Sequence, residues 1–183
     1  DSVRVKRIFT FKEIELMQVL SEIIGNTLQR KSHIEKIQDQ DRDFKNLFDT
    51  MAQGVVYQDA NGQIIQANTA ALRLLGLTMQ QLLGKDSMDS EWHAVNSEGQ
   101  PLPGDQHPAM IALKTGQPVY NVEMGIYHPI QKQHIWILVS AMPEFRNGES
   151  KPFRVFATFQ DITQNKKDAI QLAINEQRLR SII

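Results

Sequence analysis

The sequence predicts an α+β fold in which five strands and several short helices lie between two longer helices. Val155, Ala157 and Phe159 alternate with the residues between them, which is the period of two expected of a strand. Asn61-Gly62 separates two short apolar runs and is a strong hairpin signal. Before residue 51 and after residue 163, apolar residues instead recur every three or four positions, as in an amphipathic helix.

The composition is typical of a soluble globular protein that is long enough for one complete domain with extensions. The chain has 183 residues, of which 41% are hydrophobic and 22% charged, and its net charge is −1. Without a broad cationic field, we expect no binding to nucleic acid. The chain has no cysteine, which excludes disulfides, thiolate nucleophiles and cysteine-ligated metals.

Membrane and targeting signals are weak in this sequence. The longest apolar run, residues 135–139, is far shorter than the ~20 residues that span a bilayer. Residues 1–7 lack the apolar segment of a signal peptide, and the chain does not begin with Met. We therefore expect a fragment of a longer cytoplasmic protein, with no membrane contact by this fragment.

The first predicted element is a helix that Thr10 can cap. Apolar residues from Phe11 to Leu28 are spaced as one broad helical face. From Lys31 to Met51 the apolar residues follow alternating steps of three and four, which is typical of a coiled coil. Unbroken, this helix would be ~60 Å long at ~1.5 Å per residue.

A helix of that length needs a partner, and we expect a second copy of the chain. The predicted dimer seam contains Ile34, Ile37, Phe44 and Phe48. The alternative is that the face carrying Phe44, Phe48 and Met51 covers the sheet of its own chain, and the two arrangements can hold for different turns.

The next elements are a hairpin and two short helices. Strands at residues 55–58 and 64–66 surround the Asn61-Gly62 turn, and Asn68 is well suited to cap the helix that follows. Residues 88–103 are dense in turn-forming residues and predict a loop.

A third short helix should follow this loop. Asp105 can cap it, Pro108 lies in its first turn, and Gly116 marks its end. Residues 119–127 and 134–142 then predict an antiparallel pair of strands. Both faces of the second strand are apolar, so both faces of the sheet need a covering layer.

The last strand ends near Asp161, where the chain passes directly into a helix. The Asp161 and Thr163 side chains can accept hydrogen bonds from the N–H groups of the first helical turn, and residues 166–172 contain neither Pro nor Gly. We expect the helix to leave the sheet at a fixed angle.

Asp161-Ile162-Thr163 resembles the sequence that closes PAS sensor domains. Residues 62–86 strengthen the resemblance with a strand ending in Ala67-Asn68, a short helix, a Gly, a second short helix and Gly84-Lys85. The match covers roughly residues 44–165. It implies a five-stranded antiparallel sheet whose inner face is covered by short helices and whose outer face is covered by an N-terminal helix or a second subunit.

Residues 7–30 resemble the last helix of a GAF domain, although an ordinary amphipathic helix would show the same pattern. The resemblance implies an upstream sensor domain. The predicted organisation is a GAF-like remnant at 1–30, a coiled-coil linker helix at 31–52, a PAS domain at 53–163 and a C-terminal signalling helix at 164–183.

Catalysis is not expected, because the nucleophile-elbow, phosphate-loop, dinucleotide-binding and His-Glu-x-x-His motifs are absent from the sequence. Ser32-His33-Ile34-Glu35 is similar to the phosphoacceptor segment of histidine kinases, but the Arg-Thr-Pro-Leu that follows there is missing. A solvated helix His is the simpler interpretation of His33.

Few residues of this sequence are candidates for binding a cofactor, and no metal site is predicted. His107 lies just before the predicted helix that begins at Pro108, and the corresponding helix supplies the iron ligand in PAS relatives that bind haem, but a structural role at the start of the helix also explains it. His128 and His134 could approach each other, but no third zinc ligand is evident. Trp92 and Trp136 could stack on a flavin, although large core residues are commoner.

The resemblance implies a PAS sensor or transducer module of a multidomain signalling protein, whose parent is of the histidine kinase or GGDEF (diguanylate cyclase) type. A small-molecule ligand or a partner contact would shift the sheet, and Asp161 and Thr163 would pass the shift to a downstream output domain in cis. The predicted ligand pocket contains Val56, Leu75, Met110, Leu113, Ile137, Val139, Ala157 and Phe159. The alternative is a ligand-free structural module for dimerisation and spacing.

Overall fold

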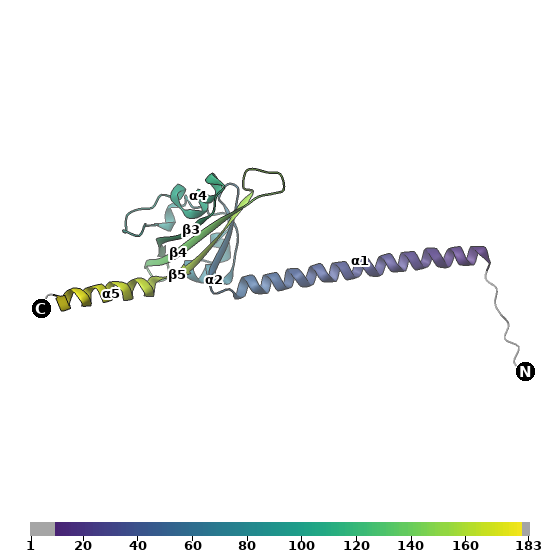
Figure 1. Ribbon diagram of the computed structural model, residues 1–183, viewed down its shortest axis with the longest axis horizontal. Helices are drawn as coiled ribbons and strands as arrows, with labels where there is room; N and C mark the ends of the chain where they lie inside the picture. The colour runs from purple at the N-terminus through teal and green to yellow at the C-terminus, as the bar shows by residue number, and fades with distance from the viewer. Residues whose placement is uncertain (1–9, 181–183) are drawn as a thin grey trace, which may run out of the picture. The chain divides into compact units, whose positions relative to one another are not determined.

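The computed structural model describes residues 10–180 (Figure 1). Contacts divide the chain into two units, residues 1–47 and residues 48–183. Residues 1–9 of the predicted GAF-like remnant and residues 181–183 of the predicted signalling helix lie outside the described residues. The domain boundaries given above remain predictions.

The first unit is formed by helix α1 (Phe11–Thr50) up to Leu47. The helix begins after Thr10, whose backbone N–H and hydroxyl donate to Glu13 Oε2 at 2.8 and 2.9 Å, so the Thr10 side chain donates here rather than accepting from a helix N–H as expected. This is half of a capping box, in which the third helical residue reaches back to the cap. Large apolar side chains remain exposed along the helix, among them Leu16, Leu20 and Ile23.

The second unit contains one antiparallel sheet of five strands in the order β2-β1-β5-β4-β3. The strands are β1 (Gly54–Asp59), β2 (Ile64–Ala67), β3 (Val119–His128), β4 (Gln133–Glu144) and β5 (Arg154–Asp161). The β1–β2 hairpin and the β3–β4–β5 meander are joined by pairing of β1 with β5. The predicted fold class is therefore confirmed.

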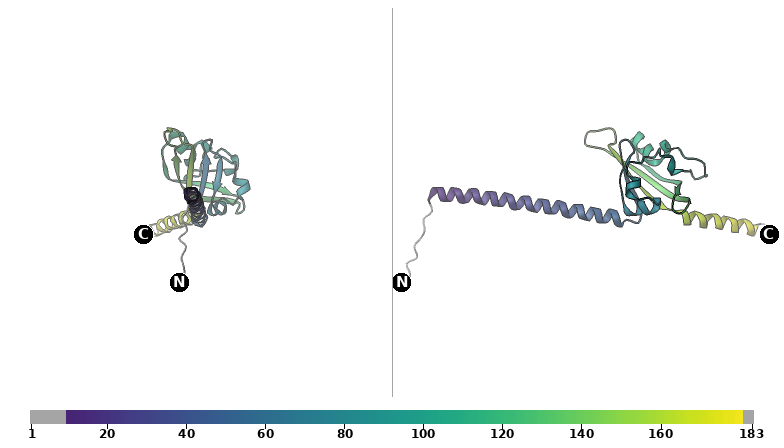
Figure 2. Two further views of the ribbon diagram at one scale, coloured as in Figure 1. Left: turned by 90° about the vertical axis from the view of Figure 1, so that its right-hand side faces the viewer. Right: turned by 180° about the vertical axis from the view of Figure 1, so that it is seen from behind.

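Three short helices cover the inner face of this sheet (Figures 1 and 2). They are α2 (Thr69–Leu75), α3 (Met79–Leu82) and α4 (Pro108–Thr115). Gly116 ends α4 with a φ of 67°, a left-handed conformation that favours glycine. Each helix contributes small or branched apolar side chains to one core with the sheet, including Ala71, Leu82 and Ala112.

The cap expected for α4 is wrong. Asp105 lies in a short 3₁₀ helix, η2 (Gly104–Gln106), and the N-cap residue is His107, which makes no side-chain capping bond. Because η2 already turns the chain toward α4, Asp105 lies before the helix rather than at its start.

Asn68 is fully buried and connects three elements. Its Oδ1 accepts from the backbone N–H of Ala71 at 2.8 Å, which caps α2 as predicted, and from that of Val55 in β1 at 2.9 Å. Its Nδ2 donates to the carbonyls of Phe48 and Gln53, each at 2.9 Å. The last turn of α1 is thus tied to β1 and α2.

The outer face of the sheet is only half buried. Trp136, Leu138 and Met142 project from this face of β4, while Ile137 and Val139 on the same strand are buried in the core. Phe48, from the last turn of α1, packs on Tyr57 of β1 with ring centroids 6.1 Å apart. The second unit therefore leaves much of this apolar face open to a further layer.

Candidate functional site

A cavity of about 80 Å³ lies between the inner face of the sheet and the short helices. It is called the inner cavity below. Its lining residues come from all five strands, the C-terminal end of α2, the start of α4, and the segment between α3 and α4. They are Val56, Gln58, Ile64, Leu75, Ser87, Trp92, His107, Pro108, Ala109, Met124, Ile126, Ile137, Val139, Ala157 and Phe159.

The floor of the inner cavity follows from strand alternation. Successive side chains of a strand point to opposite faces, so Ile137 and Val139 of β4, and Ala157 and Phe159 of β5, share the inner face. Pairing of Val139 with Phe159 places these two strands in register beneath the cavity.

One corner of the inner cavity is polar. Gln58, Ser87 and His107 are all at least nine-tenths buried. Gln58 Nε2 donates to Ser87 Oγ at 3.4 Å. Gln58 Oε1 and His107 Nε2 are buried and have no hydrogen-bond partner among the described residues. Unpaired buried polar atoms are costly, so this corner is suited to a ligand that would pair them.

Burial lowers the pKa of His107, and this effect outweighs a hydrogen bond to the Leu102 backbone and the charge of Asp105, which both raise it. The imidazole is therefore neutral at pH 7. Because Nε2 has no partner, the backbone hydrogen bond to Leu102 assigns the ring proton to Nδ1, and in this tautomer Nε2 carries the lone pair.

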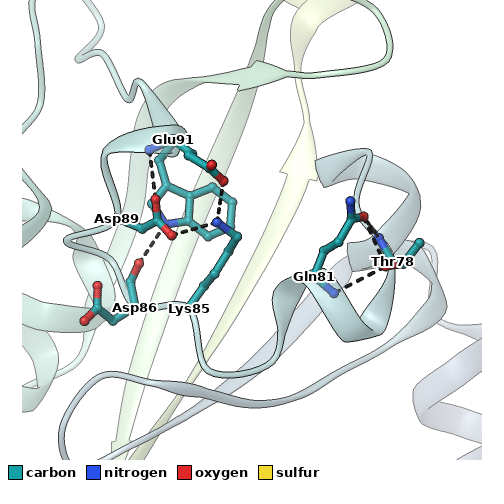
Figure 3. Close-up of polar contacts among 7 residues, drawn as sticks. Thr78, Gln81, Lys85, Asp86, Asp89 and Glu91 are labelled. Atoms are coloured by element: carbon teal, nitrogen blue, oxygen red, sulfur yellow. Dashed lines mark hydrogen bonds and ion pairs between the residues drawn. The ribbon is translucent and has the colours of Figure 1, made fainter.

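The loop over the polar corner is held by an ion-pair cluster, shown in Figure 3 and called the Lys85 cluster. Lys85 Nζ lies 2.6 Å from Asp89 Oδ2 and 2.6 Å from Glu91 Oε2. The hydrogen bond to Lys85 is the main cause that lowers the pKa of Asp89. Because Ser87 lies between these residues in sequence, the cluster fixes the segment that brings Ser87 to the cavity.

Trp92 forms part of the wall between the inner cavity and the surface. Its Nε1–H donates to the Asp86 carbonyl at 2.7 Å, within the loop that the Lys85 cluster holds. Trp92 and Leu75 line both the inner cavity and a surface groove beside α2 and α3. Displacing the Trp92 ring would therefore connect the two spaces.

The second candidate feature is the segment Asp161, Ile162 and Thr163, called the exit junction, which leads into helix α5 (Thr163–Arg180). Asp161 Oδ1 accepts from the Thr163 N–H at 2.8 Å, as expected. Thr163 Oγ1 instead accepts from the backbone N–H of Trp136 in β4 at 2.9 Å, and the Ile162 N–H donates to the Trp136 carbonyl at 2.8 Å. The start of α5 is thus bonded to the backbone of β4 near the beginning of that strand.

Lys166, one turn into α5, adds a third connection between α5 and the sheet. Its ammonium lies 4.0 Å from the centroid of the Trp136 ring and 2.7 Å from Glu123 Oε2 in β3. Trp136 is next to Ile137, whose side chain lines the inner cavity. One strand therefore faces the cavity with one residue and the exit junction with its neighbour.

The structure brings most of the predicted pocket residues together around the inner cavity. Met110 and Leu113 of α4 do not line it. The lining residues among those predicted are Val56, Leu75, Ile137, Val139, Ala157 and Phe159. Their role in ligand binding stays a prediction.

The predicted dimer seam is divided between the two units. Ile34, Ile37 and Phe44 have exposed fractions of 51%, 55% and 53%, whereas Phe48 is 6% exposed within the second unit. Phe48 thus packs on the sheet of its own chain, which is the alternative to a place in the dimer seam. A seam through the other three residues stays a prediction.

The two histidines that the sequence could bring together, His128 and His134, each have another partner. His128 Nδ1 accepts from the Gln131 N–H at 3.2 Å, and His134 Nε2 lies 2.9 Å from the His93 carbonyl. Within residues 10–180, no group of three or more His, Cys, Asp or Glu side chains is placed to hold a metal ion.

The two candidates for flavin stacking lie on different faces. Trp92 is in the cavity wall, and Trp136 is on the outer face under Lys166. A volume of about 80 Å³ is also well below that of sites for drug-sized ligands, ~300 Å³ or more, so haem or a flavin does not fit the cavity in this form.

Gln58 and Ser87 were missed by the sequence reasoning. Gln58 has the same alternation phase as Val56, and that signal could have placed it on the inner face. Ser87 lies in a loop, where no periodicity indicates direction. None of the helices in the described part of the chain combines the length and apolar character needed to cross a membrane.

Comparison with known proteins gives one family match. The family model described as "PAS fold" matches residues 42–162. No curated protein sequence matches the chain. Similar structures include a PAS domain from Colwellia psychrerythraea, with a TM-score of 0.52 and 20% identity, covering 67% of this chain and 97% of that one.

Two further structures show the same likeness. The PAS domain of an HTR-like protein from Haloarcula marismortui has a TM-score of 0.53 and 15% identity, covering 72% of this chain and 99% of that one. The Rhodobacter sphaeroides LOV protein has a TM-score of 0.52 and 19% identity, covering 68% of each chain. At these identities the likeness shows the fold alone.

Proposed function

We propose that this chain, which belongs to the PAS family, is a non-catalytic sensor and transducer module of a cytoplasmic signalling protein. Its parent is of the histidine kinase or GGDEF type, with a GAF-like domain upstream and an output domain downstream. Occupancy of the inner cavity, or contact with a partner, shifts the sheet, and α5 carries the shift onward. A ligand can do this only if it binds the two arrangements with different affinity.

The observation that carries this proposal is the bonding of the exit junction to β4. Thr163 and Ile162 both bond to the backbone of Trp136, at 2.9 and 2.8 Å. The adjacent Ile137 lines the inner cavity. Because interiors are closely packed, a change at Ile137 displaces the Trp136 backbone and hence the first turn of α5.

A homodimer is the expected working state. Apolar side chains are exposed along many turns of α1, and leaving so much apolar surface in water is unfavourable. A second helix packed against α1 would bury this surface. The proposed seam is Ile34, Ile37 and Phe44, and the heptad-like spacing favours a helix of the same sequence as partner.

The relay can be tested without knowing the ligand. Ala157→Val adds two methyl groups to the inner cavity as a permanent occupant, and Thr158→Val, on the outer face of the same strand, is the matched control. We expect Ala157→Val to change hydrogen exchange at residues 165–167, with Thr158→Val leaving it unaltered.

A double-mutant cycle then assigns the coupling to the junction. In a Thr163→Val background, Ala157→Val should no longer change hydrogen exchange at residues 165–167, which corresponds to a coupling free energy of about 0.5 kcal/mol or more between the two positions. Thr163→Ser keeps the hydroxyl and should preserve the effect of Ala157→Val. Equal effects of Ala157→Val in both backgrounds would contradict a relay through Thr163.

A ligand-free module for dimerisation and spacing is the second candidate, and the small volume of the inner cavity favours it. Native mass spectrometry of the chain purified from its source separates the two functions. A bound small molecule is expected for the sensor, and its absence in every preparation would favour the spacing module.

A further inference from the structure

The two unpaired atoms of the inner cavity are both acceptors. Gln58 Oε1 is a carbonyl oxygen, because the amide nitrogen is the atom that donates to Ser87. His107 Nε2 is buried and unpaired, and it carries a lone pair in the neutral tautomer with the proton on Nδ1, which the backbone hydrogen bond to Leu102 assigns. A molecule in this corner must therefore donate hydrogen bonds to be held there.

The charge of the ligand is limited by the lining. None of the residues that line the inner cavity in the described part of the chain is Asp, Glu, Lys or Arg. An ion buried there would have no opposite charge to offset its lost hydration. The ligand should therefore be neutral.

The size of the ligand is limited by the volume. The inner cavity, at about 80 Å³, has about half the volume of the ~150 Å³ engineered cavity that binds benzene. Roughly three to five non-hydrogen atoms fit in such a space. Beyond the polar corner the walls are apolar, including Ile137, Val139 and Phe159, so one end of the ligand should carry hydrocarbon.

We propose that the inner cavity binds a small neutral molecule with an apolar end and a group, such as a primary amide, that donates hydrogen bonds to Gln58 Oε1 and His107 Nε2. The inference rests on the proposed function as a ligand sensor, and it names the chemical class of the ligand. The recognition comes from the corner formed by β1 and the residue before α4.

Acetamide and acetone are the probes that test it, since they have the same shape and differ in an NH₂ group against a methyl group. Each is titrated to tens of millimolar into the ¹⁵N-labelled 183-residue chain. The Gln58 side-chain amide and the His107 ring nitrogens report the contact by NMR. A cavity with no unpaired hydrogen-bond acceptors would bind acetone more tightly than acetamide, because removing the amide group from water costs more free energy than removing a ketone.

The expected result is saturable binding of acetamide at least about fivefold tighter than that of acetone. Gln58→Met and His107→Phe each remove one acceptor while nearly keeping the size, so each should weaken acetamide about fivefold and leave acetone within twofold. Gln66→Leu, at an exposed position of β2, is the matched control and should change neither. If His107→Phe does not fold, Gln58→Met alone carries the test.

The outcomes are distinct. Saturable binding of acetone equal to or tighter than that of acetamide would overturn the donor class and leave a ligand-binding cavity in place. Failure of both probes to give saturable shifts at the lining residues would overturn this inference together with the ligand part of the proposed function. Preference for acetamide that survives Gln58→Met would also overturn the assigned recognition.

Discussion

At the scale of single residues, Asn68 shows how one amide can hold several elements together. All of its hydrogen-bonding groups are used inside the protein, and they reach β1, α2 and the end of α1. A buried amide of this kind contributes less through its own bonds than it costs when its partners are left unpaired. Removal of the side chain would leave buried N–H and C=O groups in three segments without partners.

We therefore expect Asn68→Ala to lower the free energy of unfolding by about 2–4 kcal/mol. Urea denaturation followed by circular dichroism measures it. Asn165→Ala, at an exposed position of α5, is the control and should change the value by less than about 0.5 kcal/mol. A loss at Asn68 as small as that at Asn165 would show that water replaces the four bonds.

His107 gives the fold a predicted dependence on pH. Burial lowers its pKa in the folded chain below the ordinary value of 6.5. Between the two pKa values the unfolded chain binds a proton that the folded chain does not, so the stabilisation is complete above pH 6.5 and is lost as the pH falls below it.

Stability should therefore decrease from pH 7 to pH 5 with a contribution from His107 of at most about 1.4 kcal/mol per pH unit. His107→Phe removes this titration and should flatten the profile over that range. The measurement is the urea midpoint at successive pH values. Identical slopes for the two proteins would exclude His107 as the cause.

At the scale of elements, the loop after α3 depends on the Lys85 cluster rather than on regular secondary structure. Lys85 bridges two carboxylates, and its side chain is only 18% exposed, so its charges are screened less than those of an open surface pair. The loop carries both Ser87 and Trp92 to the inner cavity. The order of the cavity wall should then depend on one ammonium group.

Lys85→Met keeps most of the side-chain stem and removes the charge. We expect faster hydrogen exchange at residues 86–92 and a loss of about 1 kcal/mol in the free energy of unfolding. Lys151→Met, in the exposed β4–β5 loop, is the matched control and should change neither. Unaltered exchange at residues 86–92 would mean that the hydrogen bonds within the loop, such as that from Trp92 to the Asp86 carbonyl, hold it without the ion pairs.

At the scale of the whole molecule, the N-terminal helix and the sheet unit should respond differently to the same kind of substitution. Ile37 is 55% exposed in α1, whereas Phe48 is 6% exposed in the sheet unit. In the proposed dimer a charge at the first position would face the partner helix, whereas a charge at the second enters a packed interior.

Sedimentation at tens of micromolar should show a dimer for the native chain and a monomer for Ile37→Glu, with thermal stability of the sheet unit retained. Phe48→Glu should instead lower the free energy of unfolding by more than about 3 kcal/mol. The control for charge is Gln38→Glu, next to Ile37 but off the seam. A native chain that sediments as a monomer would rule out the seam.

Much of this architecture was predictable because local patterns decide it. Alternation placed Ile137, Val139, Ala157 and Phe159 on one face, and Asn61-Gly62 located the first hairpin. The polar corner was not predictable in full, because Ser87 lies in a segment without helical or strand periodicity, and side-chain contacts such as the Lys85 cluster hold that segment in place. Helical phase alone also could not separate Leu75, which reaches the cavity, from Met110 and Leu113, which do not.

The position of the two tryptophans gives the molecule built-in optical probes. Trp92 lies in the wall of the inner cavity, and Trp136 lies beneath the Lys166 ammonium at the exit junction. Indole emission depends on local polarity and nearby charge. Trp92→Phe and Trp136→Phe would each leave a single emitter, so fluorescence could time the arrival of a ligand and the response of α5 separately, without any added label.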